Sequence, residues 1–169
     1  MDIDILVVQP TDAYLGQKDI QQALLIRRLC ADLLLSHPKP QNLHIIPTAR
    51  ALSGLALSSR NSYLGDMELA FAATLYQALK EGEKAWSAGL GRDGAVRQAT
   101  EFAERRAGEA KGLKVELKLD YVEINDPETF EVVESDKGDR PVIFSGALWV
   151  GRTRLIDNIL IGDHTGILS

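Results

Sequence analysis

The sequence predicts an α/β fold: a short parallel β-α-β unit, then a small α+β domain with a three-stranded antiparallel sheet. Two apolar segments near the start flank one helical pattern, an order that favours a parallel strand pair with a right-handed crossover. Two more helical patterns follow, and three strand-like segments occupy the last third of the chain. The composition shifts near residue 62. We therefore expect domains at 1–62 and 63–169.

The first domain is predicted from its apolar segments. "DILVVQP" at 4–10 is a continuous apolar run stopped by proline, as in a short buried strand. "NLHIIP" at 42–47 is the second expected strand, and 48–62 is rich in small polar residues, as in a loop. Parallel sheets are normally covered on both faces. So small a unit is therefore expected to be part of a larger fold.

The segment at 18–36 is expected to be the crossover helix. It ends at His37-Pro38, because a residue before proline disfavours the helical conformation. The side chains expected on its apolar face are Leu25, Ile26, Leu29, Cys30 and Leu33.

The second domain is predicted to contain helices at 66–88 and 94–110, separated by "GLGRDG". Their expected inward side chains are Leu69, Ala72, Ala73, Tyr76 and Leu79 on the first, and Ala95, Ala99, Phe102 and Ala103 on the second. Strands are expected at 115–126, 141–150 and 153–162, and Gly151-Arg152 forms a hairpin-like connection between the last two.

Composition excludes several classes of partner. The net charge of −5 argues against a nucleic-acid surface, which needs clustered Lys and Arg. No apolar run approaches the length of a membrane span, and the acidic start "MDIDILVVQ" is unlike a secretory signal. One cysteine, Cys30, excludes an internal disulfide, and we expect it to be a packed core thiol. We therefore expect a cytoplasmic protein without nucleic-acid or membrane partners.

A candidate site follows the first expected strand. Gly16, Lys18 and Asp19 lie where a strand gives way to a helix, and helix N-termini attract anions. Gly16 permits close backbone approach, Lys18 supplies a charge for phosphate or carboxylate, and Asp19 suits a ribose hydroxyl or a helix cap. Gln22, one turn later, shares a face with Lys18. The plain alternative is a glycine turn with a solvated lysine and a capping aspartate.

A second candidate is "LSSRN" at 57–61. Two hydroxyl groups followed by a guanidinium suit phosphate oxygens, because arginine binds them bidentately. A polar loop with a helix cap fits the same residues. Tyr14, His44 and Arg50 are further candidates for substrate binding, although a lone histidine in a short strand also fits a structural role.

Four segments together resemble a known family: "AYLGQKDIQQALLIRRL", "IIPTAR", "GLALSSRNSYL" and "RTRLIDNI". In this order they are similar to pantothenate synthetase (pantoate–β-alanine ligase), most closely to fungal members, over nearly the whole chain. The resemblance implies a Rossmann-like nucleotidylyltransferase domain and a C-terminal lid. It also implies the use of ATP and magnesium to form an acyl-adenylate of pantoate, which β-alanine attacks.

The resemblance also assigns roles to residues. Gly16 and Asp19 resemble ribose contacts, Lys18 a phosphate-contacting lysine, and Gln22 a pantoate-binding glutamine. The remaining nucleotide contacts implied are Ala49, whose backbone corresponds to an adenine contact, and Ser58, Ser59 and Arg60, which resemble the loop around the triphosphate. Leu15 departs mildly from the family, which has phenylalanine there.

A larger departure shapes the expected function. The family's His-x-Gly-His motif and second pantoate glutamine are not found, and His37, His44 and His164 fit no such spacing. We therefore expect a truncated Rossmann-like remnant that does not form pantothenate by itself. The favoured interpretation is a repurposed enzyme of specialised metabolism that catalyses a cyclisation, condensation, isomerisation or addition on a small molecule. Lys18, Asp19 and Arg60 would be its catalytic residues, and it would require no cofactor or metal.

Two alternatives remain. One is half of a ligase, or a non-catalytic binding module, that needs a partner to supply the missing ATP-binding half. In that case ATP and magnesium are required. The other is a fragment with little activity. In any of these cases a truncated parallel sheet leaves an unpaired edge, formed by "DILVVQ", and an uncovered apolar face. We therefore expect a homodimer or higher oligomer joined through residues 1–50.

Overall fold

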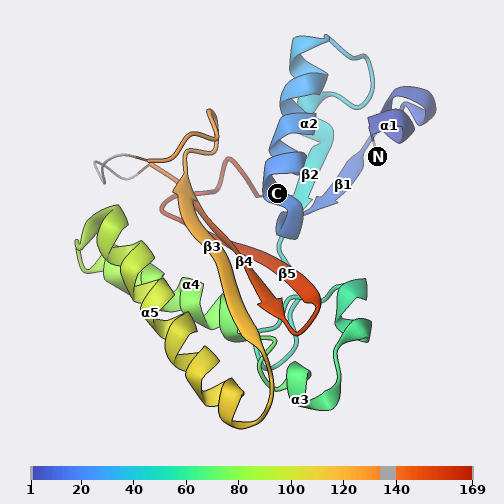
Figure 1. Cartoon of the computed structure of the whole chain (residues 1–169). Coiled ribbons are helices and arrows are strands. Elements are labelled where there is room, and N and C mark those ends of the chain that lie inside the picture. Colours follow the sequence, from blue (N-terminus) through green and yellow to red (C-terminus); the bar gives the residue numbers. More distant parts are fainter. Residues whose placement is uncertain (1, 134–139, 169) are drawn as a thin grey trace. The chain divides into compact units, whose positions relative to one another are not determined.

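The computed structural model describes residues 2–133 and 140–168. By internal contacts the chain divides into two compact units: unit 1 comprises residues 1–48 and 163–169, and unit 2 comprises residues 49–162 (Figure 1). The boundary expected at residue 62 rests on composition and on family resemblance. It remains a prediction, because compact units defined by contacts need not coincide with a family's domains.

Unit 1 contains the expected parallel β-α-β arrangement. Strand β1 (Ala13–Gly16) pairs in parallel with β2 (Leu43–Ile46), in a register that sets Ala13 opposite Leu43 and Gly16 opposite Ile46. The crossover contains a 3-10 turn, η1 (Gln17–Asp19), then α2 (Ile20–Asp32) and a second 3-10 turn, η2 (Pro40–Asn42). This fold class is the one that the sequence predicted.

The first strand was predicted in the wrong place. Residues Asp2–Val8 form helix α1, and the strand that pairs with β2 begins at Ala13. A short apolar run fits a helix as well as a strand, and periodicity alone does not separate them. Because "DILVVQ" is helical, it is not an edge strand. Ile5 is buried, whereas Leu6, Val7 and Val8 are exposed.

The buried face of α2 also differs from the expectation. It consists of Ile20, Ala23, Ile26 and Cys30, whereas Leu25 and Leu33 are each 56% exposed. The helix carries leucines around much of its circumference, so the sequence did not determine which stripe packs on the strands. Leu25 of α2 and its C-cap residue Leu33 therefore remain in contact with solvent.

The C-terminal tail belongs to unit 1. Arg27 of α2 donates hydrogen bonds through Nη2 to the carbonyl oxygens of Leu43 (2.9 Å) and Ile167 (3.0 Å), and through Nη1 to that of Gly166 (3.3 Å). Burial lowers the pKa of the Arg27 guanidinium. One side chain thus joins the helix, the strand and the tail.

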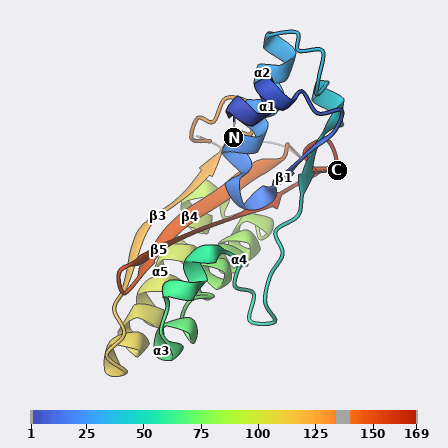
Figure 2. The same ribbon diagram turned by 90° about the vertical axis from the view of Figure 1, so that its right-hand side faces the viewer.

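Unit 2 is an antiparallel sheet with helices on one face. Its strands β3 (Leu117–Asn125), β4 (Val142–Val150) and β5 (Thr153–Ile161) lie in the order β3-β4-β5. Helices α4 (Thr74–Ser87) and α5 (Gly91–Gly112) pack together against this sheet (Figures 1 and 2). The prediction of three strands in the last third of the chain is confirmed.

The helix expected at 66–88 is interrupted. A one-turn helix, α3 (Asp66–Leu69), is separated from α4 by residues 70–73. Ala72, Ala73 and Leu79 are buried as expected, but Leu69 is exposed. Gly82 lets α4 approach the sheet closely, because a Cβ there would lie 2.3 Å from the ring of Phe144. Among the described residues, no helix is long and apolar enough to cross a membrane.

Candidate functional site

The candidate residues near the start of the chain cluster at the carboxyl end of β1. Gly16 is extended (φ −80°, ψ 134°), and a Cβ at this position would meet no atom within 4 Å. The next residues form η1, where Lys18 Nζ lies 3.8 Å from a carboxylate oxygen of Asp19. Carboxyl ends of parallel strands are the usual place for ligands in α/β folds. The open space beside Gly16 allows a ligand to approach the backbone.

Asp19 occupies the N-cap position of α2, but its side chain makes no capping hydrogen bond to the helix. The carboxylate is therefore not used in the structural role that the sequence left open. Gln22, in the first turn of α2, is exposed. Both side chains are thus accessible beside the Gly16 turn.

Gln17 was missed by the sequence reasoning. Its side chain is buried, and its Oε1 accepts a hydrogen bond from the backbone N–H of Thr48 at 3.4 Å. Thr48 follows β2, so this contact fixes the turn after β1 against the end of the neighbouring strand. The sequence signal for Gln17 as a site residue was only its position between a glycine and a lysine, which is weak.

Tyr14 and His44 lie side by side on the sheet of unit 1. Their register positions are opposite each other, their rings stack with centroids 4.9 Å apart, and His44 Nε2 lies 3.2 Å from Asp12 Oδ1. Asp12 was not predicted, because it lies outside the expected strand. The three side chains form a polar and aromatic surface, and their role in substrate binding remains a prediction.

The second group of candidates belongs to unit 2. Residues 49–57 form a small hairpin: the N–H of Leu57 donates to the oxygen of Ala49 and that of Ala51 to the oxygen of Leu55, both at 2.9 Å. This hairpin leads into the 3-10 turn η3 (Ser59–Tyr63), which Ser58 caps by accepting from the N–H of Arg60 at 3.3 Å. The structural cap expected as an alternative is therefore present.

The Ser58–Arg60 loop remains open to a ligand. Ser58 makes a short-range contact, and the exposed Arg60 donates from Nη1 to the carbonyl oxygen of Arg154 at 3.2 Å. The guanidinium has five N–H donors, so one bond to a carbonyl leaves donors for an anion. The loop therefore has the chemistry that phosphate binding requires.

Arg50 has a different environment from the other candidates. Its guanidinium makes a bidentate ion pair with Asp157 of β5 (2.5 and 2.9 Å) and lies 3.9 Å from the ring centroid of Tyr76. The sequence reasoning did not single out Asp157. An acid within the apolar strand "RLIDNILI" was the available signal, because buried charges are nearly always paired.

The structure thus gathers the candidates into two groups. Unit 1 holds Tyr14, Gly16, Lys18, Asp19, Gln22 and His44, and unit 2 holds Ala49, Arg50, Ser58, Ser59 and Arg60. Among residues 2–133 and 140–168, no group of three or more His, Cys, Asp or Glu side chains could hold a metal ion.

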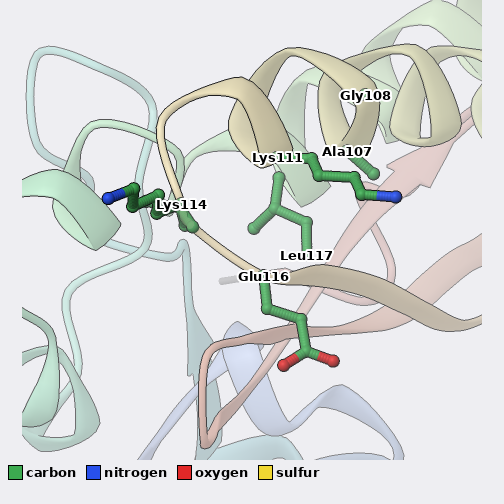
Figure 3. Close-up of a pocket in the computed structure, with 7 residues that line it drawn as sticks. Ala107, Gly108, Lys111, Lys114, Glu116 and Leu117 are labelled. Carbon is green, nitrogen blue, oxygen red and sulfur yellow. The ribbon is translucent and has the colours of Figure 1, made fainter.

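A cavity of about 540 Å³ lies elsewhere in unit 2, between the end of α5 and the start of β3. Its lining includes Lys111, Lys114 and Glu116, and none of the predicted site residues. Figure 3 shows the polar ends of these three side chains directed away from one another. They do not converge on a common ligand position, so this cavity is not the candidate site.

Comparison with known proteins identifies the family. Residues 5–160 match the family described as pantoate-beta-alanine ligase. A pantothenate synthetase from Moorella thermoacetica is 42% identical over 155 residues, which cover 92% of this chain and 50% of that protein. A bifunctional pantoate ligase/cytidylate kinase from a Synechococcus strain is 40% identical over 161 residues, which cover 94% of this chain and 27% of that protein.

Solved structures agree. The pantoate-beta-alanine ligase (pantothenate synthetase) of Thermus thermophilus superimposes with a TM-score of 0.75 at 35% identity, over 92% of this chain and 51% of that one. The ligase of Francisella tularensis, solved with beta-gamma ATP and beta-alanine, has a TM-score of 0.57 at 25% identity, over 92% of this chain and 46% of that one.

The chain spans about half the length of the pantothenate synthetases that it matches. The proteins named here are not fungal, so the expected closeness to fungal members remains a prediction. The match over residues 5–160, the identities of 40% and more, and the shared fold lead to one conclusion: this chain belongs to the pantoate–β-alanine ligase family.

Proposed function

We propose that this chain supplies the C-terminal half of a pantoate–β-alanine ligase. In this proposal it catalyses ATP-dependent amide formation in the cytoplasm only together with a complementary half that carries the rest of the Rossmann-like domain. The proposal refines the family assignment to one reaction and one partner.

The exposed face of the parallel sheet carries the argument. On one face of β1 and β2, Leu15, Leu43 and Ile45 are buried. On the other face Tyr14 is 68% and Ile46 is 40% exposed. Parallel sheets occur almost only with both faces covered, so the second face fits a surface made for a further layer of protein.

Two exposed leucines, one on α2 and one at its C-cap, point to the same need. Leu25 of α2 and Leu33, the C-cap residue that follows the helix, are both exposed, and covering such side chains with a further layer of protein would remove apolar area from water. The matched relatives are about twice as long. Their additional length is enough for a domain half that covers such surfaces.

Each unit by itself carries polar groups that suit an anionic ligand. The Gly16 turn offers open backbone and Lys18, while the Ser58–Arg60 loop offers hydroxyls and a guanidinium. Each group can stabilise phosphate oxygens, as is required when a carboxylate attacks the α-phosphate of ATP and pyrophosphate leaves. The Francisella relative was solved with beta-gamma ATP and beta-alanine, which supports this substrate class. Magnesium at such sites is usually bound by several waters, one or two carboxylates and the phosphates of the substrate.

The competing hypothesis is an ATP-independent enzyme of specialised metabolism that uses Lys18, Asp19 and Arg60. It shares the candidate residues with the ligase, but it requires neither a partner nor ATP. No observation on the described residues favours it over the ligase half, and one experiment separates the two.

The experiment is complementation. The purified chain is mixed with the part of the Moorella thermoacetica pantothenate synthetase that lies outside the matched region, and pantoate, β-alanine, ATP and Mg²⁺ are added. We expect pantothenate and AMP from the mixture and from neither component alone. Lys18→Ala should reduce the rate by about 100-fold, since one such donor stabilises the transition state by about 3 kcal/mol. Lys84→Ala, at an exposed position of α4, is the control.

Two outcomes would contradict the proposal. One is pantothenate formation by the chain alone at the rate of the mixture. The other is a stable complex of the two halves that forms no product. Turnover of another small molecule by the chain without ATP would favour the competing hypothesis.

A further inference from the structure

The guanidinium of Arg50 is surrounded by protein. Beyond its two bonds to Asp157, Nη1 donates to the carbonyl oxygen of Gly54 at 3.1 Å and Nη2 to that of Asn158 at 3.4 Å. One face of the group lies on the Tyr76 ring. These contacts use most of the five donors, which leaves little capacity for a substrate.

The carboxylate of Asp157 depends on this contact. Its side chain is 5% exposed, and its Oδ1 also accepts from the N–H of Asn158 at 2.8 Å. A buried carboxylate is strongly unfavourable without a partner. Arg50 therefore lies where β5 needs a positive charge, and the ion pair joins the 49–57 hairpin to the sheet.

The tip of the hairpin is held by the same group. Gly54 has φ +93°, and a Cβ there would lie 2.6 Å from Cδ1 of Tyr76. Only glycine adopts this conformation readily and lets the backbone lie on the aromatic ring. Tyr76 thus contacts both the guanidinium and the tip, while Arg50 binds the Gly54 oxygen.

The hairpin in turn places the loop that follows it. Its second arm ends at Leu57, next to Ser58, and Asn61 Nδ2 donates back to the carbonyl oxygen of Ala56 at 3.0 Å. The contacts run without a break from Asp157 through Arg50 and the hairpin to η3.

We propose that Arg50 is a positioning residue, which acts through the hairpin to hold the Ser58–Arg60 loop in the conformation that receives a polyphosphate. Arg50 itself contacts no substrate, in contrast to the role expected from the sequence. The identity of the ligand rests on the proposed ligase function, but the mechanical role of Arg50 does not.

The first test uses amide hydrogen exchange on the chain. Arg50→Lys keeps a positive charge beside Asp157 but cannot make the fork, so the fold is retained. We expect exchange at Ala51, Leu57 and Asn61 to accelerate at least about tenfold, while the amides of β4 keep their protection. Arg97→Lys is the control, since Arg97 forms an exposed pair with Glu101 within α5 (3.9 Å).

The second test uses the reconstituted ligase. Arg50→Lys should raise KM for ATP about tenfold and leave KM for pantoate unchanged. A purely structural role would accelerate exchange equally in β4 and the hairpin, and a substrate-binding role would raise KM for pantoate. Either result overturns the proposal, as does unchanged exchange. If no ligase is reconstituted, the proposed function fails, whereas the exchange data still decide the role of Arg50.

Discussion

The phenol ring of Tyr14 stacks on the imidazole of His44 at 23° between ring planes, on the exposed face of a two-stranded parallel sheet. Adjacent side chains on the same strands, Leu15 and Ile45, are buried on the opposite face. Successive side chains on β1 and β2 thus point to opposite faces of the sheet. One set stabilises unit 1, and the other set is available to a partner. This arrangement allows the two roles to be tested on the same strands.

Replacing Tyr14 and Ile46 by serine should weaken binding of the complementary half without unfolding the chain. Exposed positions usually change stability by no more than about 0.5 kcal/mol each. Ile45→Ala is the contrasting variant and should lose about 2–5 kcal/mol, because it leaves a cavity in the core. Urea unfolding and titration calorimetry measure the two effects. Unchanged affinity of the serine variant would remove this face from the interface.

Gly16→Ala should reduce activity without reducing the stability of the fold. Gly16 is extended, with open space around its Cβ direction, so alanine should leave the free energy of unfolding unchanged or raise it by up to about 1 kcal/mol. In the reconstituted ligase, the added methyl group should crowd the ligand that lies against the Gly16 backbone. Crowding a packed contact costs about 1–3 kcal/mol, so turnover should fall by roughly tenfold.

Gly151→Ala is the control for that pair of measurements. Gly151 has φ +56°, and a Cβ there would meet the Glu68 carboxylate. Alanine should lower stability there by about 1 kcal/mol while activity per folded molecule is retained. Full activity of Gly16→Ala would mean that no ligand approaches the β1 turn closely.

The exposed leucines at positions 25 and 33 should cause self-association when no complementary half is present. We propose that the chain then forms a homodimer or higher oligomer through residues 1–50, with Leu25 and Leu33 in the contact. Burial of apolar area stabilises such a contact by about 25 cal/mol per Å², less the cost of association. Sedimentation velocity at low micromolar concentration should show a dimer, and Leu25→Gln with Leu33→Gln should shift it to monomer.

Ile26→Ala is the control on the same helix, since Ile26 is buried. It should destabilise the fold by about 2–5 kcal/mol rather than change the association alone. A wild-type chain that sediments as a monomer would refute the self-association.

Cys30 should react slowly with thiol reagents in the folded protein. Its side chain is 1% exposed, and burial raises the pKa of the thiol. A raised pKa lowers the thiolate fraction at pH 8, and thiolate is the reactive form. We expect labelling to be on the order of 100-fold slower than in urea and to increase as the pH rises further. Labelling at the unfolded rate would show that unit 1 opens freely around α2.

The elements predicted correctly are those whose hydrophobic pattern fits only one type of secondary structure. The three strands of unit 2 were located within about two residues, because alternation and the Gly151-Arg152 turn define them. The alanine stripe of α5 at 95, 99 and 103 was also correct. Long periodic segments carry enough information to fix both their type and their buried face.

The wrong predictions concern segments whose local hydrophobic pattern fits two structures equally well. "DILVVQP" satisfies a strand and a helix equally, and α2 offers more leucine than one face can bury. Tertiary contacts decide both cases. The candidate site was found in part: Lys18 and Arg60 follow from charge and turn chemistry, whereas Asp157, Gln17 and Tyr76 act through contacts distant in sequence. No local motif encodes such contacts.

The Arg27 contacts have a consequence for the order of folding during synthesis. Residues 166 and 167 bind a helix formed almost 140 positions earlier, so unit 1 is discontinuous in the chain. Unit 2 is continuous from 49 to 162, so all of its residues are synthesised before the tail that completes unit 1. Until residues 166 and 167 are present, the Arg27 guanidinium lacks two of its three carbonyl partners, so unit 1 is the last part of the chain to gain its full set of contacts.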